Sequence, residues 1–174
     1  LFQGRSQLLV YHFMFGPDAD QGCPSCSYYA DHVPDLHHLE SRNTSFAAVS
    51  RAPIAKIEAF KKRMGWNFPW YSSFGTDFNY DFHVTQDESV VPVEYNFKDK
   101  PTLLKQGLAH TIQGEQPGMS AFFSDGQNIF HTYSTYARGL DRFLGTYLML
   151  DLTHLGRQDD GNPGLGFVHH DRYE

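Results

Sequence analysis

Two cysteines are the residues best suited to chemistry in this sequence. They are its only cysteines and stand close together in Cys23-Pro24-Ser25-Cys26. A thiolate is the nucleophile of disulfide exchange, so the pKa of the attacking cysteine controls that reaction. A lone C-x-x-C pair is typical of a redox dithiol, whereas a disulfide framework scatters its cysteines along the chain. We therefore predict that Cys23 is the nucleophile and that Cys26 is the resolving thiol.

The segments on either side of the cysteines indicate where the pair must lie. Residues 6–15 form a nearly unbroken apolar run rich in β-formers, which predicts a buried central strand of the parallel type. Breakers fill residues 16–22, and Pro24 suits the first turn of a helix, where its missing N–H costs nothing. We expect the dithiol where a strand gives way to a helix. At that position the helix N-terminus favours the Cys23 thiolate.

The rest of the chain alternates strand-like and helix-like patterns. A strand, a helix and a second strand imply a parallel pair, and an Asp-Gly turn between two β-rich runs predicts a hairpin. The expected fold is α/β, with a central mixed sheet of four strands flanked by helices. The predicted elements after the dithiol are a strand at 44–50, a helix at 54–64, an insertion with short helical pieces at 86–116, hairpin strands at 119–123 and 128–133, and a helix at 140–150.

Composition limits the classes of partner. The 174 residues are 40% hydrophobic and 20% charged, which allows a buried core and predicts one domain over residues 1–174. A net charge of −6 argues against a nucleic-acid partner, which needs a basic surface. No run approaches the roughly 20 apolar residues of a membrane span, and no signal peptide opens the sequence. These features and the lone dithiol predict a cytoplasmic protein without a membrane partner.

The order of the elements resembles the thioredoxin-like arrangement, and the hairpin is similar to the closing strands of peroxiredoxins. Four segments resemble, more narrowly, the DUF899 family of thioredoxin-like proteins. They are residues 4–17, residues 130–139, Gly22-Cys23-Pro24-Ser25-Cys26-Ser27 and Val49-Ser50-Arg51-Ala52-Pro53. The resemblance implies a single thioredoxin-like domain. Because family members usually begin some tens of residues earlier, the chain is expected to lack an N-terminal extension.

Two arginines are further candidates for the site. Arg51 and Arg138 both follow strand-like segments, whose ends lie near the dithiol in the thioredoxin arrangement. An arginine there would stabilise a thiolate or bind a carboxylate. A structural ion pair with Asp141 or another acid explains each arginine equally well. We therefore name Cys23, Cys26, Arg51 and Arg138 as candidate catalytic residues and keep the structural alternative for the arginines.

Ten histidines keep metal chemistry open. Thiolate and imidazole suit zinc and copper, and thioredoxin-like copper chaperones resemble this layout, although the spacing between their cysteines is one residue longer. The alternative hypothesis is a copper- or zinc-binding protein with Cys23, Cys26 and His131 as ligands. His83 and His12 are further candidates for the third ligand. Two histidine pairs are expected in solvent, namely His37-His38 and His169-His170.

Two sequence features differ from those of related families and argue against some activities of those families. Thioredoxin-like proteins keep a cis-proline that faces the dithiol, just before a strand of the sheet. Here Pro117 lies too far before the expected strand, and Met119 is expected at the position of that proline. This departure argues against general exchange with protein disulfides. No Pro-x-x-x-Thr-x-x-Cys run precedes either cysteine, which argues against a peroxiredoxin role. The leading hypothesis is a thiol-disulfide oxidoreductase that needs no cofactor and acts on a thiol or disulfide, either a small molecule or a protein.

Aromatic residues make up 16% of the chain, and many of them fall in residues 66–82. This segment has two interpretations. Its rings either pack the core of a small domain or form a binding wall for a flat organic ligand beside Cys23. Core packing is the simpler interpretation. A large apolar pocket beside Cys23 would favour an enzyme that acts on a small molecule.

Overall fold

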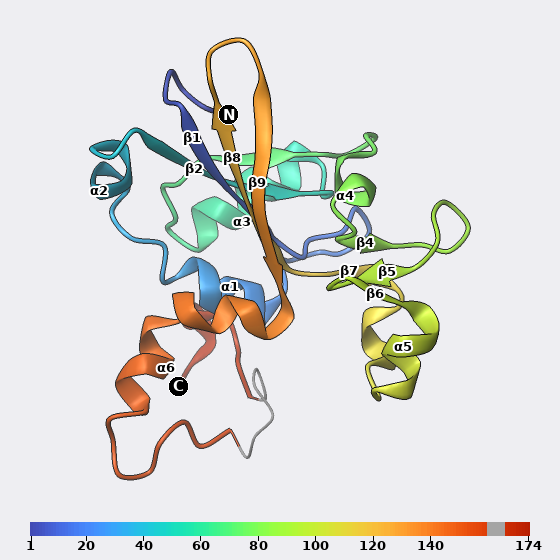
Figure 1. Cartoon of the computed structure of the whole chain (residues 1–174). Helices are drawn as coiled ribbons and strands as arrows, with labels where there is room; N and C mark the ends of the chain where they lie inside the picture. The colour runs from blue at the N-terminus through green and yellow to red at the C-terminus, as the bar shows by residue number, and fades with distance from the viewer. Residues whose placement is uncertain (160–165) are drawn as a thin grey trace.

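The centre of the fold is a five-stranded sheet, seen in a computed structural model that describes residues 1–159 and 166–174. The strand order is β3-β2-β1-β8-β9 (Figure 1). Strand β1 is central because it pairs in parallel with β2 and antiparallel with β8. The five strands are β1 (Gln7–His12), β2 (Thr44–Ser50), β3 (Trp70–Ser72), β8 (Gly118–Ser124) and β9 (Ile129–Tyr136).

The predicted order of elements is confirmed. Helix α1 (Pro24–Ala30) begins directly after Cys23, and helix α3 (Ile54–Arg63) makes the crossover that brings β3 into parallel pairing with β2. The hairpin of β8 and β9 turns at Asp125, whose carboxylate accepts hydrogen bonds from the N–H groups of Gln127 and Asn128. The fold class is therefore α/β, with a mixed central sheet flanked by helices.

Two predicted elements differ from the structure. The expected sheet of four strands has five, because the short β3 pairs with the end of β2 and draws Trp70 into the core. The expected helix over residues 140–150 is divided into the 3₁₀ segment η2 (Ala137–Phe143) and helix α6 (Gly145–Leu150). Leu144, with φ −96° and ψ 84°, interrupts it. Helical spacing of apolar residues does not reveal such a break.

The insertion before the hairpin folds around a small core of its own. Val84, Val93, Tyr95 and Leu103 are buried together with Tyr136 from the end of β9. The insertion lies at one end of the sheet in Figure 1. Its elements are α4 (Phe78–Asp81), β4 (Thr85–Gln86), β5 (Glu94–Tyr95), β6 (Lys98–Asp99), α5 (Lys100–Lys105), η1 (Ala109–Thr111) and β7 (Gly114–Glu115).

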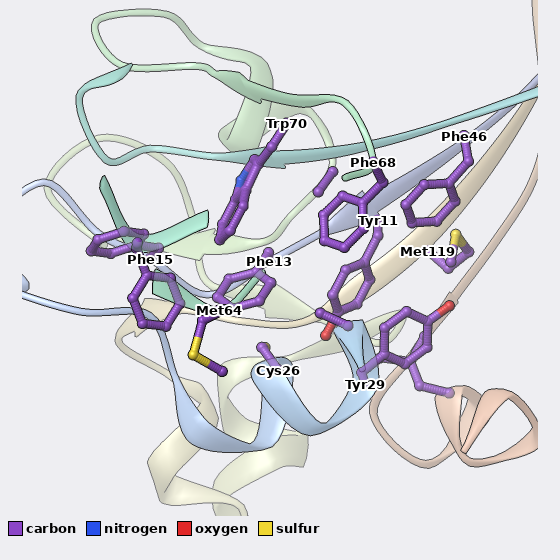
Figure 2. Close-up of a cluster of buried hydrophobic side chains, with 14 of the residues drawn as sticks. Tyr11, Phe13, Phe15, Cys26, Tyr29, Phe46, Met64, Phe68, Trp70 and Met119 are labelled. Carbon is purple, nitrogen blue, oxygen red and sulfur yellow. The ribbon is translucent and has the colours of Figure 1, made fainter. Parts of the chain in front are cut away.

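Aromatic side chains fill the main core between the sheet and helices α1 and α3. Figure 2 shows Tyr11, Phe13 and Trp70 among them. The rings of Phe13 and Trp70 lie 4.5 Å apart between centroids, and Phe13 also contacts Phe60 from α3. Phe68 and Trp70, from the aromatic segment at 66–82, are 5% and 3% exposed. Core packing is thus the role of these two rings.

The opposite face of the sheet carries a second apolar cluster. Residues alternate sides along a strand, so Leu8, Val10 and His12 face away from Tyr11. Leu8 and Val10 pack with Ala47 and Val49 of β2. None of the described helices is both long and apolar enough to cross a membrane. The remaining short elements are α2 (Leu36–Glu40) and the 3₁₀ segment η3 (His170–Arg172).

Candidate dithiol site

The two cysteines lie where β1 gives way to α1, as the sequence predicts. Cys23 is the N-cap residue of α1 and Cys26 lies one turn inside the helix. The backbone of Met14, just beyond β1, contacts both residues. Its carbonyl accepts a hydrogen bond from the Cys23 N–H at 3.0 Å, and its own N–H donates to the Cys26 Sγ at 3.5 Å. The central strand therefore fixes the position of the pair.

The two thiols differ in access. Both are free, but Cys23 is half-buried whereas the Cys26 residue is only 2% exposed. A molecule in solvent therefore has easier access to Cys23 than to Cys26, which packs in the core. The roles of nucleophile and resolving thiol stay predictions for these two residues.

The thiols also differ in their acidity. The Cys26 S–H donates a hydrogen bond to the Cys23 sulfur, and this bond, aided by the backbone N–H groups of Ser25 and Cys26, lowers the pKa of Cys23 from 9.0 to about 6. Burial opposes the shift. Burial raises the pKa of Cys26, and the neighbouring Cys23 raises it further. The opposite shifts of the two pKa values favour a thiolate at Cys23 and a thiol at Cys26.

A pocket of about 480 Å³ opens beside the dithiol and includes both cysteines in its wall. Its rings come from β1, α1, the insertion, α6 and the C-terminal segment. The aromatic residues that line it are Tyr11, Tyr28, Tyr29, Tyr95, Tyr147 and Phe167. None of the lining residues belongs to the aromatic segment at 66–82, so the alternative interpretation of that segment as a binding wall is wrong.

The C-terminal segment packs against the dithiol loop. His169 is 3% exposed, and its Nε2 hydrogen-bonds the carbonyl oxygen of Gly22 at 2.8 Å. The expectation that His169 lies in solvent is therefore wrong. Phe167 stacks on Tyr28 of α1, with centroids 4.0 Å apart and planes at 24°. Sequence spacing cannot show that residues so distant along the chain meet the dithiol.

Arg138 lies in the wall of this pocket, in η2. Its Nη2 pairs with the Asp141 carboxylate at 2.5 Å, which is the structural partner that the sequence suggested. Arg138 therefore both lines the pocket and forms an ion pair. A catalytic role for Arg138 stays a prediction.

Arg51 lies outside the pocket that contains the cysteines. Its Nη1 pairs with the Glu115 Oε1 at 3.2 Å, and its guanidinium lies 5.1 Å from the centroid of the Tyr80 ring. The Glu115 Oε2 accepts hydrogen bonds from Asn79 and Thr85, so this ion pair joins the insertion to the end of β2. The contacts support a structural role, and a catalytic role for Arg51 also stays a prediction.

The structure does not bring His131 to the two cysteines. That residue is exposed on β9, and its Nε2 hydrogen-bonds the Ser134 Oγ at 2.7 Å. Within the part of the chain that the structure describes, no three His, Cys, Asp or Glu residues lie close enough together to hold a metal ion. Cys23, Cys26 and His131 therefore do not form the predicted ligand set. The fold separates them because β9 carries His131 away from α1.

His12 belongs to a hydrogen-bonded row that crosses the sheet on the face opposite the dithiol. Its Nε2 hydrogen-bonds the Ser120 Oγ at 2.8 Å. The Ser120 Oγ hydrogen-bonds the Ser134 Oγ at 2.7 Å, and the Ser134 Oγ also hydrogen-bonds His131. Burial, together with a smaller contribution from His131, lowers the pKa of His12 to about 3. His12 is therefore neutral at ordinary pH.

One residue of the site escaped the sequence analysis. Tyr11 is 1% exposed, and its hydroxyl hydrogen-bonds the Cys26 sulfur. Figure 2 shows the hydroxyl directed toward α1 beside Cys26. A buried tyrosine needs a partner for its O–H, so a tyrosine in the strand that leads to the cysteines is a signal that could have been used.

The strand order, the helix after β1 and the dithiol at its start define a thioredoxin-like α/β protein. Two solved structures share this fold with TM-scores of 0.51. One is a cysteine-to-serine variant of PrxQ from Xylella fastidiosa, 13% identical, over 83% of this chain and 77% of that one. The other is the peroxidoxin BcpB from Mycobacterium tuberculosis, 14% identical, over 83% and 80%.

The chain belongs to the DUF899 family, described as bacterial protein of unknown function, whose profile matches residues 1–173. The resemblance inferred from the four sequence segments is confirmed. A search of curated proteins found no match to this chain. Function must therefore be argued from the site itself.

Proposed function

We propose that this protein is a thiol-disulfide oxidoreductase that cycles Cys23 and Cys26 between dithiol and disulfide. The observation that supports it best is the asymmetry of the pair. The more accessible sulfur has its pKa lowered to about 6, and the buried sulfur keeps its proton. This is the arrangement that a nucleophile and a resolving thiol require.

The reaction has two steps. The Cys23 thiolate attacks one sulfur of a substrate disulfide, forming a mixed disulfide and releasing the other half as a thiolate. Cys26 then attacks the Cys23 sulfur, and its proton goes to the second half of the substrate as that half leaves. Two electrons pass from the dithiol to the substrate, and the Cys23–Cys26 disulfide remains. An external thiol reductant regenerates the dithiol.

A peroxide is a second candidate substrate, since one protein of similar fold is named a peroxidoxin. The Cys23 thiolate would attack the O–O bond and become a sulfenic acid, with release of an alcohol or water. Cys26 would condense with the sulfenic acid to give the same disulfide and a water molecule. The missing Pro-x-x-x-Thr-x-x-Cys run argues against this substrate.

The test is turnover with a thiol reductant and either a disulfide or a hydroperoxide, followed in the parent, Cys23→Ser and Cys26→Ser. We expect the parent to reduce the disulfide faster than the hydroperoxide and Cys23→Ser to be inactive with both. In Cys26→Ser, mass spectrometry should find the substrate half trapped on Cys23. Parent-like turnover by Cys23→Ser would overturn the proposal. If the parent reduces the hydroperoxide faster than the disulfide, the preferred substrate is the hydroperoxide.

A further inference from the structure

We propose that the pocket beside Cys23 binds the substrate, and that this substrate is a small disulfide with a flat, aromatic body. This inference rests on the proposed function and adds the class of molecule to it. The volume of about 480 Å³ lies within the roughly 300–1,000 Å³ of small-molecule sites.

The shape of the lining favours flat groups. One stacked pair of rings stands half-buried in the wall, where Phe167 stacks on Tyr28 of α1, the helix that carries the cysteines, with centroids 4.0 Å apart and planes at 24°. Tyr11 and Tyr29 stack in the same way but are buried in the core. A flat ring can pack against such surfaces, because offset stacking of aromatic groups is favourable. The pocket thus offers aromatic contact next to the nucleophile.

The walls that border the dithiol are held in place, which argues against a protein substrate. The C-terminal segment is attached to α3 by Arg63, whose Nε and Nη2 each donate to Asp171 at 2.8 Å. On the same segment, His169 bonds the carbonyl of Gly22, beside Cys23. These contacts fix the walls around the dithiol, and such a preformed pocket suits a small molecule better than an extended protein segment.

The experiment compares the aromatic disulfide dithiodipyridine with the protein disulfides of insulin. The variant Leu108→Trp places an indole on the pocket wall, where Leu108 is half-buried. The matched control Leu104→Trp changes a residue of α5 that is 46% exposed and outside the lining. In the parent, we expect the ratio of kcat/KM for dithiodipyridine to that for insulin to exceed, by about 100-fold, the ratio of the rate constants of dithiothreitol for the same two disulfides, which corrects for the better leaving group of dithiodipyridine. Leu108→Trp should lower kcat/KM for dithiodipyridine roughly tenfold, and Leu104→Trp should leave it unchanged.

A second variant, Phe167→Ala, removes one wall and should raise KM for dithiodipyridine more than it lowers kcat. Comparable reduction of insulin by the parent, or equal activity of the two tryptophan variants, would overturn the pocket proposal alone. Failure to reduce either disulfide, despite alkylation of Cys23 by iodoacetamide at pH 7, would overturn the proposed function instead. Near-ultraviolet circular dichroism shows that each variant is folded.

A different observation assigns a role to Tyr11. Two donors converge on the buried Cys26 sulfur, the Met14 N–H at 3.5 Å and the Tyr11 hydroxyl. We infer that Tyr11 is a positioning residue that stabilises the developing Cys26 thiolate when Cys26 attacks the mixed disulfide. Because the ring of Tyr11 is held by its stacking on Tyr29, the hydroxyl stays directed at the sulfur.

Dithiodipyridine separates the two chemical steps, since each releases one equivalent of absorbing thiopyridone. In stopped-flow measurements, Tyr11→Phe should leave the first phase unchanged and slow the second by roughly tenfold to 100-fold. The pH profile of the second phase should also move to higher pH. Tyr136→Phe is the matched control, because it removes the hydroxyl of another buried tyrosine, which bonds the Phe82 carbonyl and lies outside the pocket lining. Equal second phases in Tyr11→Phe and the parent would overturn the inference, as would an equal effect of Tyr136→Phe.

Discussion

Two buried clusters of titratable side chains lie on opposite faces of the same sheet, and both contain a group with a strongly lowered pKa. On one face the pKa of Cys23 falls to about 6, chiefly because the Cys26 S–H donates a hydrogen bond to its charged form. On the other, the pKa of His12 falls to about 3, chiefly because burial disfavours its charged form. The first environment stabilises a charge and the second excludes one.

The two clusters also differ in whether a substrate can reach them. Cys23 borders a pocket, so its thiolate can meet a substrate. The His12 ring packs beside Phe78 and Phe82, and its Nδ1 has no hydrogen-bond partner among the described residues. A shifted pKa therefore indicates a functional site only when its cause stabilises a reactive form and a substrate can reach it.

The largest expected effect is the loss of turnover in Cys26→Ala and Cys26→Ser, two variants that should differ in the pKa of Cys23. Both variants lose the resolving thiol, so turnover should fall on the order of 10³-fold or more. Serine keeps an O–H donor, and only alanine removes the hydrogen bond that lowers the pKa of Cys23. We expect the rate of alkylation by iodoacetamide against pH to give a pKa near 6 in Cys26→Ser and a clearly higher value in Cys26→Ala. Equal pKa values in the two variants would contradict the assigned cause.

The second prediction concerns stability and pH on the His12 face. The folded pKa of about 3 lies below the ordinary value of 6.5, so the unfolded chain takes up a proton that the folded chain does not. The stabilisation is complete above pH 6.5 and is lost as pH falls toward 3, at about 1.4 kcal/mol for each pH unit. Urea unfolding from pH 7 to pH 5 measures this slope. In His12→Gln, whose side chain does not titrate, the change in the free energy of unfolding per pH unit should be smaller by this amount. An unchanged slope would show that other groups cause the pH dependence.

The third prediction concerns Ser120, which links His12 to Ser134 in the hydrogen-bonded row. Ser120→Ala leaves the His12 Nε2 without its partner in a buried site, which should lower the free energy of unfolding by about 1–3 kcal/mol. Ser124→Ala, on the same strand, is the control, because Ser124 is only half-buried. Dithiol activity per folded molecule should be the same in both variants. A loss of activity in Ser120→Ala would show that the two faces are coupled.

The smallest effect is expected from Arg138→Gln. In its ion pair with Asp141 the guanidinium is exposed and the carboxylate half-buried, so stability should change by no more than about 1 kcal/mol. The causes that lower the pKa of Cys23 are hydrogen bonds from Cys26 and Ser25, so that pKa should stay near 6. Alkylation of Cys23 against pH checks this. A raised pKa would instead make Arg138 part of the stabilisation of the thiolate.

Much of the fold follows from local patterns. The apolar run at 6–15, Pro24 after Cys23 and the turn at Asp125-Gly126 predict β1, α1 and the hairpin, because each depends on backbone preferences over a few residues. The break at Leu144 could not be predicted in this way. It depends on how η2 and α6 pack, and apolar spacing does not record that packing.

The sequence by itself determined the family, the fold class and the place of the dithiol at the start of a helix. Only the tertiary structure decided the environment of that dithiol. It placed Tyr11 against Cys26, brought Phe167 onto α1 and His169 onto the loop before Cys23, and carried His131 to the edge strand of the sheet. The physical reason is that pKa values, pockets and ligand sets depend on distances between residues far apart along the chain. Local patterning does not specify those distances.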